Sequence, residues 1–206
     1  MTTRNSMTTM ITTTRAKWTL SGLALASLVA CSGGGGDNPP PPPPPKTIAD
    51  RLDYTNPTSG TYTLVKDAAS TPTHLVLNLM GPVGTQGTGV GFYLSADTSK
   101  VTWSKPAGSD SILARNGVFD LGTSPQLAVA KANGDQIQVG FYQKGTTKPA
   151  VTFTAMSILA SVALDLKSNV PLGAVAFSAV SNKAVLTNGS AAPAAIVLST
   201  GTLSAN

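Results

Sequence analysis

One pattern recurs along most of the chain and limits what it can fold into: apolar side chains alternate with polar or small ones at a period of two. The longest run is Ile158–Leu166, in which five apolar residues share one parity while Ser161 and Asp165 fall on the other. A period of two indicates a strand with one buried and one exposed face, whereas an amphipathic helix needs a period near 3.6. No long helical period accompanies the alternation, so the sequence predicts an all-β domain.

The other alternating runs are short, and Gly, Pro, Asn, Asp and Ser separate them, as expected of turns. Strands are expected at residues 60–66, 74–80, 89–95, 101–103, 127–129, 137–141, 158–166, 175–177, near 185, at 196–198 and near 203. Asn133-Gly134 is the pair that a type I′ hairpin turn favours, and residues 108–114 fit either a loop or a helical turn. Short strands at this spacing predict a β-sandwich or a barrel, and residues 47–206 are enough for one buried core.

The N-terminus has the organisation of a secretory signal. Arg15 and Lys17 precede an uncharged apolar run of thirteen residues, 18–30. A membrane-spanning helix needs about 20 residues, so a positive segment followed by a short apolar one indicates export instead. The run ends in Leu28-Val29-Ala30-Cys31, at the single cysteine of the chain. Both Met1 and Met10 remain candidate starts of this signal.

That ending resembles the lipobox of bacterial lipoproteins, in which the cysteine becomes the mature N-terminus and carries the lipid. The resemblance implies removal of residues 1–30 and lipidation at Cys31, with a free cysteine near an ordinary cleavage site as the alternative. Each acyl CH₂ that enters the bilayer contributes about 0.8 kcal/mol, so two or more chains anchor a protein stably. By the same resemblance, Ser32 favours the outer membrane of a Gram-negative bacterium, facing either the periplasm or the cell surface.

A tether is expected at residues 31–46, between the lipid and the domain at 47–206. Four glycines, 33–36, form a disordered flexible segment, and seven prolines, 39–45, form a polyproline II rod. At about 3.1 Å per residue the rod is roughly 20 Å long. A spacer is what a lipidated cysteine needs next, although a proline-rich ligand for a partner domain is the alternative function.

Charge and composition exclude several classes of function. The formal net charge is +5, but the signal contains Arg4, Arg15 and Lys17, and the remaining basic residues are scattered. A nucleic-acid binder needs its basic residues clustered on one face, so no nucleic-acid partner is expected. With one His and one Cys, the chain has neither a Cys/His zinc cluster nor an internal disulfide.

Two groups of segments resemble the cohesin family. Gly89-Val-Gly-Phe-Tyr-Leu-Ser-Ala-Asp97, followed by Val101-Thr-Trp103, is similar to the early part of a cohesin domain, where a strand ends in a turn and another strand follows. The segments that resemble its C-terminal half are residues 158–167, Pro171-Leu-Gly-Ala-Val-Ala-Phe-Ser178, Ala184-Val-Leu-Thr-Asn-Gly189 and Gly201-Thr-Leu203.

The cohesin resemblance extends from about residue 75 to 205 and implies a nine-stranded jelly-roll β-sandwich, related to carbohydrate-binding modules. The sequence departs from the family pattern at Ala96, where Tyr is usual, and at Thr98, where Pro is usual, and residues 46–73 are an extra segment. Cohesin-like domains also occur outside cellulosomes. Dockerin binding is therefore not carried over to this chain, and no partner-contacting residue is assigned by motif.

No catalytic residue, metal ligand or cofactor is expected. His74 starts a strand, and no acid or nucleophile is paired with it in the sequence, so it is interpreted as a solvent-facing histidine. Carboxylates that could serve a glycosidase or calcium are interpreted as residues of turns and polar strand faces. These are Asp97, Asp110, Asp120, Asp135 and Asp165.

The aromatic residues offer the remaining candidate site. If Phe92 and Phe141 face the core, Tyr93 and Tyr142 face outward, where an aromatic ring can stack on a sugar or anchor a protein. Their alternative role is to cover a sheet edge, and Trp103 is expected in the core. The sequence thus predicts a non-catalytic, outer-membrane-anchored module that recognises a protein partner, with a carbohydrate- or matrix-binding module as the alternative.

Overall fold

The computed structural model describes residues 43–122, 128–143, 148–155, 157–189 and 192–206. The predicted signal, Cys31 and the tether up to residue 42 lie outside the described residues, as does the start of the strand expected at 127. From Pro44 onward the chain forms one compact unit, and its described residues contain strands and turns but no helix. Within these residues there is accordingly no helix long and apolar enough to cross a membrane.

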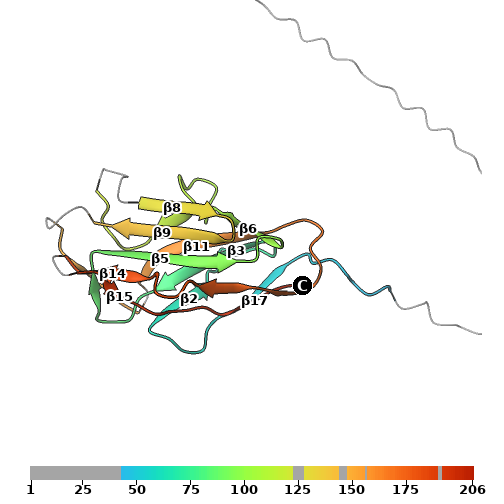
Figure 1. Ribbon diagram of the computed structural model, residues 1–206, viewed down its shortest axis with the longest axis horizontal. Coiled ribbons are helices and arrows are strands. Elements are labelled where there is room, and N and C mark those ends of the chain that lie inside the picture. The colour runs from blue at the N-terminus through green and yellow to red at the C-terminus, as the bar shows by residue number, and fades with distance from the viewer. Residues whose placement is uncertain (1–42, 123–127, 144–147, 156, 190–191) are drawn as a thin grey trace, which may run out of the picture. The chain divides into compact units, whose positions relative to one another are not determined.

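Two sheets make up the sandwich (Figure 1). The first sheet has the order β16-β2-β3-β11-β6, with β7 pairing the other half of β11. Its strands are β16 (Leu198–Ser199), β2 (Tyr62–Lys66), β3 (His74–Met80), β11 (Ile158–Leu166), β6 (Val101–Ser104) and β7 (Ala114–Asn116). All neighbouring strands are antiparallel except β16 and β2, which run parallel. This pair joins a strand near the start of the folded unit to one near its end.

The second sheet has the order β15-β14-β5-β9-β8, with β13 pairing the other end of β5. Its strands are β15 (Ala194–Ala195), β14 (Val185–Thr187), β5 (Gly89–Ala96), β9 (Gln136–Tyr142), β8 (Ala128–Asn133) and β13 (Phe177–Ala179). In Figure 1, β8, β9 and β5 run side by side. The chain passes between the two sheets several times, so the all-β, jelly-roll sandwich predicted from the sequence is confirmed.

Two smaller sheets complete the domain. One joins β1 (Leu52–Thr55), β17 (Thr202–Ala205) and β12 (Gly173–Val175), and the other joins β4 (Gln86–Gly87) to β10 (Val151–Thr152). Around β1, the amides of Asp50 and Arg51 donate to the carbonyl of Asn206, and the amide of Asn206 donates to the carbonyl of Arg51. The segment that precedes the sandwich is therefore held against its last strand.

The core lies between the two large sheets, and both contribute aliphatic side chains at alternate positions. Leu77 and Leu164 from the first sheet and Leu94 from the second have no exposed surface, and Phe92 and Phe141 are 1% exposed. Each such side chain contributes about 1.5–3 kcal/mol through burial. Trp103 is also buried, as predicted, at 7% exposure.

Two local predictions were wrong. The β8–β9 turn consists of Gly134 and Asp135, and Asn133 already pairs with Gln136, so the turn lies one residue later than expected. Among these turn residues only Gly134 has a positive φ, 56°, which excludes the type I′ turn because that turn needs two. In β11 a bulge between Ile158 and Ala160 shifts the alternation, so Leu159 is fully buried and Ile158 is not.

The outer face of the first sheet is covered, which the alternation does not reveal. After β6, residues 105–113, here called the strap, reach across β11 to β3, where the Pro106 carbonyl lies 3.4 Å from His74 Nε2. Side chains that point away from the core are buried beneath this cover: Val76 is 3% exposed and Ala163 is fully buried. Ser161, expected on an exposed face, is only 6% exposed, and it hydrogen-bonds Asn78, which in turn bonds Asp67 of the loop after β2.

Candidate functional site

The outer face of the second sheet carries a tyrosine ring that lies flat on the backbone. The residues at outward positions around it are glycines: Gly89 and Gly91 on β5 and Gly140 on β9. An ideal Cβ on Gly91 would lie 2.1 Å from the Tyr142 hydroxyl, and one on Gly89 or Gly140 would lie 2.6 or 2.9 Å from its ring carbons. No side chain fits at these three positions, so the glycines form a floor for the ring.

The consequence for Tyr142 is a fixed orientation. Its ring crosses from β9 over β5 toward β14, where Val185 pairs with Gly91. The three glycines are buried beneath the ring although they point outward, while Tyr142 itself is only half-buried. Burial, and then the neighbouring Tyr93, raise the pKa of the Tyr142 hydroxyl above its ordinary value of 10.0. One ring face is thus held against the sheet, and the other is available to a ligand.

Tyr93 lies beside this ring on the same face. It stands two residues beyond Gly91 on β5 and pairs with Gln138 of β9. We call this surface the tyrosine face, and it consists of Tyr93, Tyr142, Val129, Lys131, Gln138 and Val185. Lys131 is its one charged residue. A flat aromatic ring flanked by amide and aliphatic groups is suited to stacking and to hydrogen bonding, and neither a carboxylate nor an imidazole belongs to this face.

The sequence predicted the outward direction of both tyrosines but not their proximity. Phe92 and Phe141 are buried as expected, which places Tyr93 and Tyr142 on the opposite face. The signal that sequence reasoning missed is the glycine pattern, since Gly89, Gly91 and Gly140 only become neighbours once the register of β5 and β9 is known. A glycine inside a strand often marks a close approach of this kind.

His74 has an acid partner, contrary to the interpretation of a solvent-facing histidine. Its Nδ1 lies 2.5 Å from Asp165 Oδ1, because β3 and β11 place these residues directly opposite each other. The other ring nitrogen faces the Pro106 carbonyl. With both nitrogens facing acceptors, the ring holds the strap to the sheet, and neither nitrogen is directed at a nucleophile.

Three of the acidic residues that were assigned to turns make local hydrogen bonds to backbone amides. Asp97 accepts from the amide of Ser99, and Asp120 accepts from the amide of Gly122. Asp110 accepts from the amide of Ala107 and pairs with Arg115. In the described ranges, no three His, Cys, Asp or Glu side chains gather as they would to hold a metal ion.

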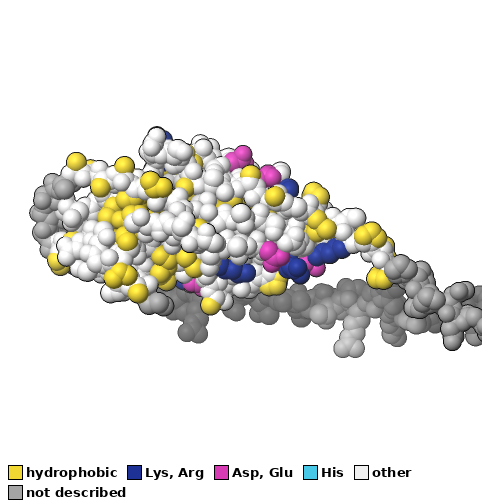
Figure 2. Space-filling view, turned by 90° about the horizontal axis from the view of Figure 1, so that it is seen from below, with side chains coloured by type: hydrophobic (Ala, Val, Ile, Leu, Met, Phe, Trp, Pro, Cys, Tyr) yellow, Lys and Arg dark blue, Asp and Glu magenta, His cyan; other side chains and the backbone are white. Residues whose placement is uncertain are grey.

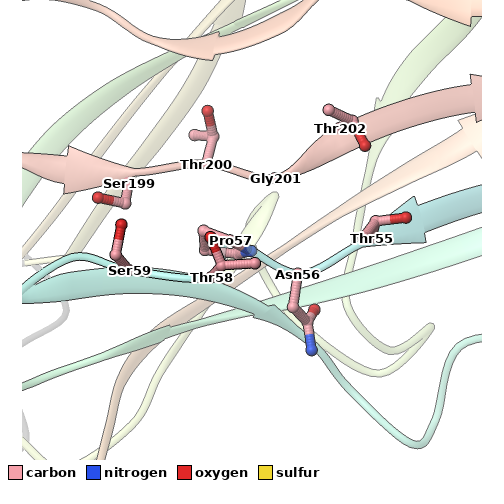
Figure 3. A pocket seen from close by; sticks show the side chains of 9 residues that line it. All are labelled: Thr55, Asn56, Pro57, Thr58, Ser59, Ser199, Thr200, Gly201 and Thr202. Carbon is pink, nitrogen blue, oxygen red and sulfur yellow. The ribbon is translucent and has the colours of Figure 1, made fainter.

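A cleft of about 440 Å³ lies between the loop after β1 and the β16–β17 connection (Figure 3). Hydroxyl side chains dominate its lining, and Ser59 and Ser199 face each other across it. Beneath it, the Tyr54 hydroxyl accepts from the amide of Gly201 at 2.7 Å and donates to the carbonyl of Leu64 at 3.0 Å. No charged side chain lines this cleft, so it offers no carboxylate or imidazole for acid–base chemistry.

The remaining surface has a separate apolar area. Seen from below, apolar side chains gather toward one end of the domain and charged ones toward the other (Figure 2). Val197 is 80% exposed and borders a groove of about 240 Å³ beside β15. The groove is lined mainly by aliphatic residues, which provide neither an aromatic anchor nor a charge.

No protein-family model matches the chain, and no curated protein matches it significantly. Among similar solved structures is the sixth cohesin of scaffoldin B from Acetivibrio cellulolyticus, in complex with a dockerin, at 15% identity. The match covers 70% of this chain and 97% of that one, with a TM-score of 0.45. A type II cohesin domain from the cellulosome of the same organism matches at 9% identity, with 70% and 94% coverage and a TM-score of 0.43. The solution structure of CaCohA2 from Clostridium acetobutylicum matches at 12% identity, with 75% and 90% coverage and a TM-score of 0.45.

Proposed function

We propose that the domain is a non-catalytic module that recognises a protein partner through the tyrosine face. The observation that carries this proposal is the Tyr142 ring, fixed flat on three glycines with Tyr93 beside it. Tyrosine is enriched among the residues that dominate binding energy at protein interfaces. A ring that is already immobilised loses little conformational entropy on binding, and this favours affinity.

The non-catalytic part of the proposal rests on the two alternative sites. The His74–Asp165 pair has both ring nitrogens facing acceptors, and the hydroxyl-lined cleft lacks charged groups. A catalytic His or carboxylate must reach a reacting group in a suitable protonation state, and neither place supports this. Binding is therefore the activity that the described surface serves best.

A binding comparison tests the tyrosine face. A chain that begins at Lys46 is immobilised, and the proteins that it captures are identified by mass spectrometry. The affinity of the purified partner for this chain is then measured. Tyr142→Ala and Tyr93→Ala should each weaken this affinity at least tenfold, or about 1.4 kcal/mol. Thr58→Ala, in the hydroxyl-lined cleft, is the control. Equal affinity of all three variants and the unmodified chain would contradict the proposal.

We further propose that the module is anchored by lipid at Cys31 in the outer membrane of a Gram-negative bacterium, after removal of residues 1–30. The support is the resemblance of residues 28–31 to a lipobox, followed by Ser32 and the Gly- and Pro-rich segment. Cells expressing the chain should incorporate a fatty-acid analogue such as alkynyl palmitate into it, and Cys31→Ala should abolish both the label and sedimentation with outer membranes. An unlabelled chain, or membrane association that survives Cys31→Ala, would contradict the anchor.

A carbohydrate- or matrix-binding module is the second candidate, and the flat Tyr142 ring favours it specifically. A ring parallel to the sheet presents the geometry that stacks against the C–H face of a sugar. Affinity electrophoresis in gels that contain cellulose derivatives, starch or xylan distinguishes the two candidates. If the polysaccharide slows the migration of the unmodified chain and Tyr142→Ala abolishes this effect, the carbohydrate function is supported. If migration is not slowed but the chain still binds a protein, the first proposal is supported.

A further inference from the structure

A polar groove crosses the outer face of the first sheet, on the side of the sandwich away from the tyrosine face. The register of three strands aligns Asn78 on β3, Ser161 on β11 and Arg115 on β7 in one cross-strand row. Asp67, in the loop after β2, borders one end of the row, and Asn116 with the two residues after it borders the other. The groove has a volume of about 310 Å³, and none of its lining residues belongs to the site proposed above.

The floor of the groove consists of buried polar side chains. Asn78 is 7% exposed and Ser161 is 6% exposed. Ser161 Oγ donates to Asn78 Oδ1 at 2.7 Å, and Asn78 Nδ2 donates to Asp67 Oδ2. Burying such groups is costly unless they are hydrogen-bonded, and this chain of bonds meets that requirement. The side chains are thereby held in fixed orientations at the bottom of the groove.

Each of these groups retains hydrogen-bonding capacity. The Asn78 amide has a second N–H, the Ser161 hydroxyl still has lone pairs, and the Asp67 carboxylate accepts only from Asn78 and the amide of Ala69 among the described residues. Arg115 uses Nε and Nη2 to reach Asp110, at 3.1 and 3.0 Å. Its Nη1 makes no hydrogen bond to the described part of the chain. Donors and acceptors therefore alternate along the groove.

The charges bordering the groove disfavour an anion. The guanidinium of Arg115 is neutralised by Asp110, so the Asp67 carboxylate leaves a net negative charge. Ile158 and Val118 add aliphatic surface at the end of the groove. A ligand that suits this lining carries several hydroxyl groups, which both donate and accept, and has an apolar C–H face and no negative charge.

We infer that the groove formed by Asp67, Asn78, Ser161 and Arg115 binds a neutral sugar ring. Adjacent hydroxyls of the ring donate to Asp67 and Ser161 and accept from Asn78 and Arg115, while the C–H face contacts Ile158. This site is separate from the tyrosine face and different in chemistry, and it does not depend on the function proposed for that face.

An NMR titration of the isotope-labelled full chain tests the inference. The probes are glucose, galactose, mannose, N-acetylglucosamine, cellobiose and maltose, with glucuronate and inorganic phosphate as anionic controls. At least one neutral sugar should produce saturable shifts in the backbone amides of Asn78, Ser161 and Arg115. Ser161→Ala and Asp67→Asn should each weaken that binding about tenfold or more. Ser178→Ala, on the outer face of the second sheet, serves as the matched control and should leave it unchanged.

Several outcomes would overturn the sugar site. The first is that no amide of the groove shows a saturable shift at sugar concentrations up to about 100 mM. The second is that the shifts are confined to the tyrosine face, and the third is that only the anionic probes bind. The amide spectra of Ser161→Ala and Asp67→Asn also report whether each variant is folded. If Ser161→Ala unfolds the chain, the conservative Asp67→Asn, which keeps the shape of the groove, decides the question.

Discussion

At the residue scale, glycine has two different roles in this domain. Gly91 and Gly140 leave room for a side chain, so their substitution displaces the Tyr142 ring, whereas a Cβ on Gly89 would also lie 2.6 Å from the Phe141 carbonyl oxygen. Gly201 instead leaves room for backbone, since its Cβ would lie 1.8 Å from the Thr55 carbonyl oxygen. A side chain can rotate away, whereas a strand cannot shift without breaking its ladder.

The two roles predict different effects of the same substitution. Gly91→Ala should lower the free energy of unfolding by less than about 1 kcal/mol but weaken binding at the tyrosine face, because the ring is lifted from its floor. Gly201→Ala should cost more than about 2 kcal/mol, because the backbone must move. Urea denaturation followed by circular dichroism measures both. Equal destabilisation by the two variants would show that the Tyr142 ring is held as tightly as the backbone beside Gly201.

Ser161 illustrates what parity alone does not predict. The alternation placed it correctly on the face opposite Val162, but its exposure depends on Arg115 of β7 and on Asp67 of the loop after β2, which come from elsewhere in the chain. The parity of a strand is a local property of its sequence. The cover over its outer face is a property of the whole fold, and it is the reason that the predicted exposure is wrong.

Ser161→Asp should consequently be severe, with a loss of about 2–4 kcal/mol in the free energy of unfolding, because it buries a charge beside Asp67 and Asn78. Ser161→Ala should cost about 1–2 kcal/mol, since it removes a donor from Asn78 Oδ1. Chemical denaturation of the two variants at neutral pH gives both values. A loss below 1 kcal/mol for Ser161→Asp would mean that the outer face is open to water.

At the element scale, the strap is fastened at two places. Pro106 meets His74 at one, and at the other Asp110 joins Arg115, the outward residue of β7. The Asp110 side chain is 16% exposed and that of Arg115 is 47% exposed. Burial alone would raise the pKa of Asp110, but the hydrogen bonds from Arg115 and from the Ala107 amide outweigh it and hold the pKa below its ordinary value of 3.8.

Because its pKa is lowered in the folded state, ionised Asp110 stabilises the fold above about pH 4. This contribution is lost as the pH falls through the pKa that Asp110 has in the folded state. Asp110→Asn should therefore be less stable than the unmodified chain by about 1 kcal/mol at pH 7, with a difference that shrinks below pH 4. Urea denaturation at pH 7 and pH 3 measures this difference in the free energy of unfolding. A double-mutant cycle of Asp110→Asn and Arg115→Gln isolates the interaction free energy of the ion pair. A difference that stays constant with pH would exclude the ion pair as its cause.

The elements also show where sequence reasoning succeeded. Long alternations such as those of β3 and β5 could be located from the sequence because half of each strand is buried in the same core. The bulge in β11 and the shifted β8–β9 turn could not, since each depends on how one strand meets its partner. The pairing of His74 with Asp165 joins residues 91 positions apart, and nothing local indicates it.

At the scale of the whole molecule, the described residues from Pro44 onward form a folded unit with its own core. Among the residues that the structure describes, the first that contribute to this core are Ala49 and Leu52, which are 8% and 2% exposed. The predicted boundary at residue 47 therefore lies just before the first buried side chain. The tyrosine face and the polar groove lie on opposite sheets, so the two ligands proposed here do not compete for one surface.

Truncation tests this boundary. A chain that begins at Lys46 should unfold cooperatively, with the stability of the full chain, because it retains every described core residue. A chain that begins at Asn56 lacks Leu52 and Tyr54 and should lose at least about 3 kcal/mol. Thermal and urea unfolding compare the three proteins. Instability of the Lys46 chain would show that residues before it contribute to the fold.

The pairing of β1 with β17 determines how the molecule responds to mechanical force. Four residue pairs join the two strands in antiparallel register, from Leu52 with Ala205 to Thr55 with Thr202. The free ends of this ladder lie side by side, so tension between the two ends of the folded unit opens it like a zipper, one pair after another, and never shears it. Pulled in this way, the domain releases β1 at low force before tension reaches β2 and, through it, the first large sheet.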